Sequence, residues 1–71
     1  MESRTKETYD TALYPADIVK RAADIYSRIC RIELTQEPRR SVCLFYGEEA
    51  EQVKGEFGNF LIELAQQKGG Q

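Results

Sequence analysis

The spacing of the apolar residues changes at Cys30, and this change limits the folds open to the chain. Before Cys30, apolar residues recur every three or four positions, as on one face of a helix. After it, Ile32 and Leu34 continue a period-two pattern, which is typical of a half-buried strand. A chain of 71 residues is long enough for one modest core. We therefore expect a single α+β domain over residues 1–71, with an ordered core at about 5–67.

The helical part of the pattern predicts a helix that begins at Pro15. Proline suits the first position of a helix, where its missing N–H would have no partner anyway. Asp17 suits the positive end of the helix dipole. The predicted helix has about four turns, and its apolar stripe contains Ile18, Ala22, Ile25 and Ile29.

The next two segments, residues 30–35 and 41–46, are predicted to form a hairpin around a turn at 36–39. Both segments have apolar residues at even positions. If these share the buried face, Ile32 lies opposite Val42.

In that register Cys43 and Phe45 lie on the exposed face of the sheet, beside Arg31. Cys30 then lies on the opposite face from Cys43, which argues against a disulfide. We expect both thiols to be free, and Cys43 to react faster because it is the more exposed of the two.

A second helix is predicted after Gly47, where acidic residues occupy the first turn. Gly55 and Gly58 lower its helix propensity, and we expect that they allow the helix to approach the sheet closely. Its apolar stripe includes Phe57, Leu61 and Leu64. The predicted core consists of Leu34, Val42, Leu44, Phe57, Leu61 and Leu64.

Residues 5–10 are polar apart from Tyr9, and this composition predicts a short edge strand. The element order is then β-α-β-β-α. A right-handed crossover places this strand beside residues 41–46, so the sheet has the order 2-3-1. The result is a two-layer sandwich with a three-stranded sheet and two helices on one face, which corresponds to a ferredoxin-like fold that lacks its last strand. One edge and one face of the sheet are predicted to be open.

The residue types argue against catalysis and metal binding. There is no histidine, which removes the commonest general base and metal ligand. Cys30 and Cys43 alone cannot make a structural zinc site within one chain. The acidic run at 48–51 is explained by helix stabilisation, and Cys43 has no base beside it in the sequence. We predict a non-enzymatic protein with no cofactor.

Two observations bear on location and association. The N-terminal residues include no apolar stretch typical of an export signal, and no apolar run approaches the roughly 20 residues that span a bilayer. These features predict a cytoplasmic protein that does not bind membranes. A core this small usually needs a partner or a second copy for stability, so a homodimer is expected.

A nucleic-acid-binding alternative depends on four arginines around the predicted hairpin, Arg28, Arg31, Arg39 and Arg40. The sequence pI of about 5.1 and the lack of an RNP-like aromatic strand make this alternative weaker than protein binding.

The run Ala12-Leu13-Tyr14-Pro15, followed by Ile18-Val19-Lys20-Arg21-Ala22-Ala23 and then Tyr26, resembles the small HxsD-like proteins. These accompany His-Xaa-Ser peptide-maturation systems, in which radical-SAM proteins are thought to modify a precursor peptide. The resemblance implies an accessory role with no catalytic residues. It also implies a radical-SAM maturation enzyme or its precursor as the partner.

The open edge and face of the predicted sheet are the expected place for that partner. An extended peptide or a second copy can add to the edge between Thr5 and Tyr9. The predicted partner-binding residues are Thr8, Tyr9, Arg31, Cys43 and Phe45. The alternative is a structural homodimer whose role lies elsewhere.

Overall fold

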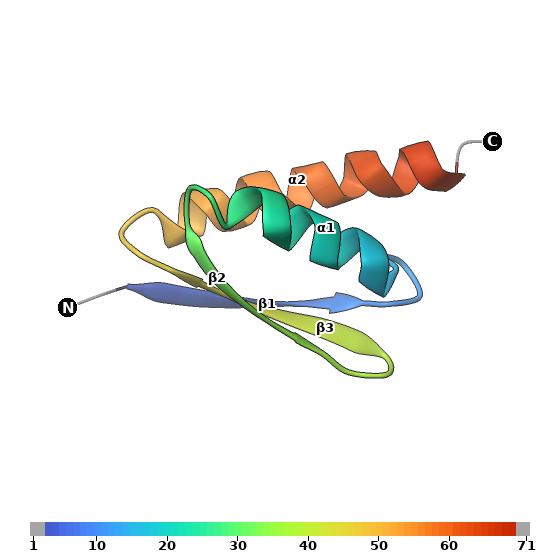
Figure 1. The fold of residues 1–71 in the computed structure, drawn as a ribbon, viewed down its shortest axis with the longest axis horizontal. Helices are drawn as coiled ribbons and strands as arrows, with labels where there is room; N and C mark the ends of the chain where they lie inside the picture. The colour runs from blue at the N-terminus through green and yellow to red at the C-terminus, as the bar shows by residue number, and fades with distance from the viewer. Residues whose placement is uncertain (1–2, 70–71) are drawn as a thin grey trace.

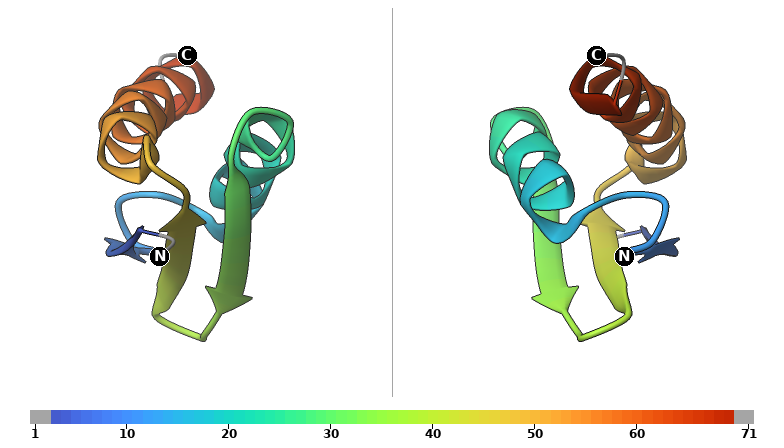
Figure 2. Two further views of the ribbon diagram at one scale, coloured as in Figure 1. Left: turned by 90° about the vertical axis from the view of Figure 1, so that its left-hand side faces the viewer. Right: turned by 90° about the vertical axis from the view of Figure 1, so that its right-hand side faces the viewer.

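The structure is a computed structural model that describes residues 3–69. It contains a three-stranded antiparallel sheet, in the order β1-β3-β2, with two helices (Figure 1). The elements are β1 (Arg4–Asp10), α1 (Ala16–Tyr26), β2 (Arg31–Gln36), β3 (Arg40–Tyr46) and α2 (Ala50–Gly69). Both helices lie on the same face of the sheet, α2 on the side of β1 and α1 on the side of β2 (Figure 2). The predicted α+β class and strand order are confirmed.

Helix α1 ends earlier than its apolar stripe predicts. The carbonyl of Pro15 accepts the first helical hydrogen bonds, and the helix stops at Tyr26. The hydroxyl of Ser27 donates to the carbonyl of Asp24 at 2.8 Å, which satisfies one of the last carbonyls. Ile29 therefore lies in the connection to β2 and is 68% exposed. The predicted four-turn length is wrong.

The β2–β3 hairpin has a tighter turn than predicted. The amide of Glu37 donates to the carbonyl of Arg40 at 2.8 Å, and the two side chains form an ion pair at 2.6 Å. Ile32 consequently lies opposite Phe45 and not opposite Val42. The pairing differs from the predicted one by an odd number of residues, which moves every side chain of β3 to the other face.

The core lies between the sheet and the helices and is organised around Phe57 of α2. Its ring is 5.1 Å from that of Phe45 and 5.7 Å from that of Tyr9. Leu61 is also fully buried, so these two predicted core residues of α2 are confirmed. The buried apolar residues are Tyr9, Ile18, Val19, Ala22, Ala23, Cys43, Phe45, Ala50, Val53, Phe57 and Leu61.

The other predicted core residues have mixed outcomes. Leu34 and Leu64 are partly buried against this core. Val42 and Leu44 are absent from it, because the register places them on the face of the sheet away from the helices. Their prediction as core residues is wrong.

Both cysteines are free, but not for the predicted reason. Cys43 lies opposite Leu34, on the helix side, and Cys30 packs against the same core. The thiols are kept apart by distance along the strands, since four residues of a strand span about 13 Å. Cys43 is fully buried and Cys30 is only partly so. We therefore expect Cys30 to be labelled first, which reverses the sequence prediction.

Candidate partner-binding site

Strand β1 forms one edge of the sheet, and two hydrogen bonds at its ends define which way its backbone points. The amide of Gly47 donates to the carbonyl of Ser3 at 2.8 Å. The amide of Thr11 donates to the carbonyl of Arg39 at 3.1 Å. In an antiparallel pair, bonded and non-bonded residues alternate. The odd-numbered residues of β1 therefore bond to β3, and the even-numbered ones direct their N–H and C=O groups away from the sheet.

Lys6 and Thr8 are the central residues of this free edge. Both are exposed, and their side chains point to the face of the sheet without helices. The intervening Glu7 points to the helix side, where it forms an ion pair with Lys54 at 3.6 Å. On the same side, a hydrogen bond from Thr5, together with Lys54, lowers the pKa of the Glu51 carboxyl. One side of β1 is thus tied to α2, and its outer edge is open.

The face of the sheet away from the helices carries an apolar stripe along β3. Val42, Leu44 and Tyr46 form this stripe and are half-buried. The guanidinium of Arg31 lies 4.8 Å from the centre of the Tyr46 ring. The Tyr46 hydroxyl donates to Glu33 at 2.8 Å, and this hydrogen bond raises the pKa of the tyrosine.

The predicted partner-binding residues are divided by the structure. Thr8 and Arg31 are exposed on the open face, but they lie on the two outer strands with β3 between them. Tyr9, Cys43 and Phe45 belong to the core, so the prediction that they present a surface is wrong. Cys43 and Phe45 are buried because the observed hairpin register differs from the predicted one and turns their side chains to the helix side. Tyr9 is buried for the same reason, because the odd-numbered residues of β1 lie on the same face of the sheet as Phe45.

Two buried acidic groups are neutral near neutral pH. Burial raises the pKa of the Cys43 thiol to about 11, with a smaller effect of Glu7. Burial also raises the pKa of Tyr9 well above its ordinary value, and Cys43 adds to this. Since the thiolate is the nucleophilic form of cysteine and the Cys43 side chain is fully buried, we expect Cys43 to react slowly in the folded protein.

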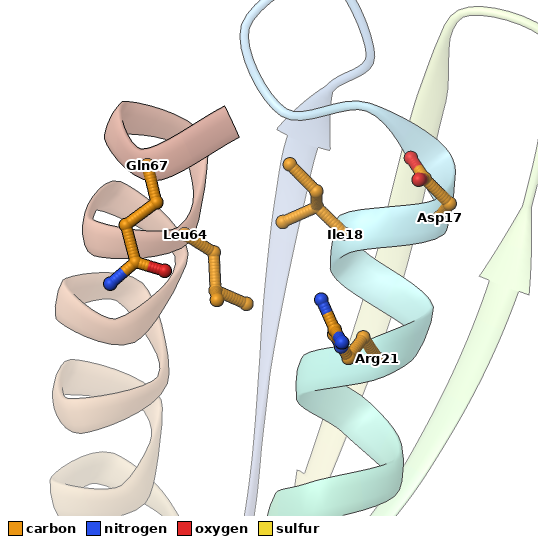
Figure 3. Close-up of a pocket in the computed structure, with 5 residues that line it drawn as sticks. All are labelled: Asp17, Ile18, Arg21, Leu64 and Gln67. Carbon is orange, nitrogen blue, oxygen red and sulfur yellow. The ribbon is translucent and has the colours of Figure 1, made fainter. Parts of the chain in front are cut away.

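A hollow of about 300 Å³ lies between the two helices (Figure 3). Ile18 of α1 and Leu64 of α2 point towards each other across it, and Arg21 reaches the same gap. Asp17 and Gln67 complete its lining. These groups do not include a nucleophile with an adjacent base.

The four arginines proposed for nucleic acid do not form one cluster. Arg31 begins β2, whereas Arg39 and Arg40 lie at the turn that follows this strand. Arg31 and Arg40 also pair with Glu33 and Glu37. The positive charge is therefore divided between the two ends of the hairpin and partly neutralised.

Over residues 3–69, no group of three or more His, Cys, Asp or Glu side chains is arranged to hold a metal ion. Within the same range, no helix has the length and apolar character needed to cross a membrane.

No protein-family model matches the sequence, and no curated protein or solved structure matches this chain. The resemblance of residues 12–26 to HxsD-like proteins therefore stays a prediction.

Proposed function

We propose that this chain is a non-catalytic binding protein that takes up an extended segment of a peptide or protein partner at the free edge of β1. The observation that carries the proposal is the outward direction of the N–H and C=O groups of Lys6 and Thr8. Such groups pair readily with an added strand. In a complete ferredoxin-like sheet the fourth strand would lie at this edge.

The composition of β1 supports a strand that stays unpaired until a partner arrives. Arg4, Lys6 and Thr8 are exposed and polar, and charged side chains on an edge oppose unspecific pairing with other sheets. The edge is thus open to a segment of complementary sequence.

The resemblance to HxsD-like proteins suggests which partner to test first. A precursor peptide supplies an extended segment directly, and a radical-SAM maturation enzyme can do so through a loop or terminus. We propose that binding takes place in the cytoplasm, with this chain as an accessory component.

The test uses two substitutions at one position. Thr8→Pro removes the outward N–H without breaking a β1–β3 hydrogen bond, whereas Thr8→Val keeps it. Immobilised wild-type protein and the Thr8→Val variant should capture the same partner from the native organism, and Thr8→Pro should not. Circular dichroism should show equal helix content in all three. Equal capture by the folded Thr8→Pro variant would refute edge binding.

A second candidate function is a homodimer formed through the open face. The half-buried stripe of Val42, Leu44 and Tyr46 supports it, because two such faces can pack together. Leu44→Glu would then yield a monomer in sedimentation, while Thr8→Pro would leave the dimer intact. A monomeric wild-type protein would exclude this candidate.

A further inference from the structure

A hollow of about 320 Å³ lies beside the free edge of β1, between this strand and α2. None of its lining residues comes from α1, β2 or β3, so it opens on the outer side of β1. An added strand would direct every second side chain into it. The hollow is lined by Glu7, Tyr9, Tyr14, Lys54, Gly55, Gly58, Asn59 and Ile62.

Two glycines of α2 form part of this hollow, and no contact among the described residues requires a glycine at either position. A Cβ atom added at Gly55 or Gly58 would meet no atom within 4 Å. The sequence prediction that they allow close approach of helix and sheet is therefore wrong. Glycine within a helix is unfavourable. A side chain from outside the chain is the group that would use the space they leave.

Tyr9 contributes a largely buried aromatic ring to the lining of the hollow. The residue is only 7% exposed, and its hydroxyl has no hydrogen-bond partner among the described residues. The ring is held edge-on by Tyr14 at 5.8 Å. Buried polar groups are rarely left unpaired. The hydroxyl oxygen itself is buried, as is that of its cross-strand neighbour Ser41, which also has no partner among the described residues.

On the other face of the edge, one end of β1 carries two cations. Arg4 and Lys6 point to the open face of the sheet, and neither forms an ion pair with a carboxylate of residues 3–69. Opposite charges on neighbouring strands stabilise their pairing. An added strand would therefore favour acidic residues at the positions next to Arg4 and Lys6.

We propose that the occupant is an extended segment of a protein partner in which apolar residues alternate with acidic ones. The apolar residues would enter the hollow between β1 and α2, and the acidic ones would pair with Arg4 and Lys6. This inference rests on the proposed edge binding and specifies the class of partner. A second copy of β1 fits less well, because it would place Glu7 in the hollow and bring two further cations to the open face.

The experiment selects peptides from a display library of random nine-residue segments on immobilised wild-type protein. The enriched sequences should alternate apolar residues with Asp or Glu. Gly58→Leu fills the hollow and should lower retention of these peptides at least tenfold, while the melting temperature is kept or raised. Glu56→Leu, which adds a leucine to an exposed position outside the hollow, is the matched control and should retain them.

The outcomes separate the inference from the proposed function. Peptides that are lost with Thr8→Pro but show no alternation, carry basic residues, or tolerate Gly58→Leu would overturn the inference and leave edge binding in place. Failure to retain any peptide, or retention insensitive to Thr8→Pro, would overturn both. A wild-type dimer that Thr8→Pro dissociates would show that a second copy is the occupant and would also overturn the inference.

Discussion

The two faces of β3 carry similar apolar side chains but have very different surroundings. Cys43 and Phe45 are fully buried beneath the helices. Val42, Leu44 and Tyr46, which alternate with them, lie on the face without helices and are half-buried. Strand β3 is therefore apolar both on the face that the helices cover and on the face without helices. This difference shows on which face the chain completes its own core and on which face it leaves apolar side chains half-exposed.

Strand β1 shows the same contrast in its backbone. Its odd-numbered residues pair with β3 and direct their side chains towards α2, as Glu7 does towards Lys54. Its even-numbered residues leave their N–H and C=O groups unpaired by the sheet. Among the described residues, β1 is therefore paired with a neighbouring strand on one side only.

The largest predicted effect compares adjacent residues of β3. Phe45→Ala should cost about 3–5 kcal/mol of unfolding free energy, because it leaves a cavity beside Phe57. Leu44→Ala should cost about 1 kcal/mol, since its side chain is only half-buried. Urea unfolding measures both. Equal losses would mean that the two faces are equally covered.

Alkaline pH should lower the free energy of unfolding through the buried Cys43 thiol. The Cys43 thiol has an ordinary pKa of 9.0 and a folded pKa of about 11, so the unfolded chain loses its proton first. Stability is complete below pH 9 and falls as the pH rises towards 11. The loss should be about 2 kcal/mol, measured by urea unfolding at pH 8 and pH 11. Cys43→Ala, although less stable overall, should show a smaller loss over this range. An unchanged loss would assign the effect to other groups, with Tyr9 the first to test.

The smallest predicted effect concerns the hollow between β1 and α2. Gly55→Ala should raise the unfolding free energy by about 0.5–1 kcal/mol, because alanine favours the helix and the added methyl group meets nothing within 4 Å. Thermal unfolding measures the change. A destabilised Gly55→Ala variant would show that the glycine is required by the fold itself.

The sequence predicted the elements and their order because Ile18, Ala22, Phe57 and Leu61 repeat at helical spacing and the chain order leaves few topologies. It did not predict which face of β3 is buried, since that strand is apolar on both. The length of the turn at Glu37 decides which face of β3 is buried, because it sets the pairing with β2. The observed pairing differs from the predicted one by an odd number of residues.

The candidate site was predicted only in part, for a similar reason. The polar edge strand around Thr8 could be recognised from composition. The hollow beside it could not, because it depends on which flank of α2 faces β1. The glycines at 55 and 58 were the available signal, and a packing role within the chain explained them equally well.

The most direct test of edge binding is amide hydrogen exchange, followed by NMR on monomeric protein with and without a selected peptide. In the free protein, the amides of Glu7 and Tyr9 should exchange slowly and those of Lys6 and Thr8 rapidly, because only the first pair is bonded to β3. With the peptide bound, Lys6 and Thr8 should become protected. Rapid exchange at both residues in the presence of saturating peptide would contradict partner binding at the β1 edge.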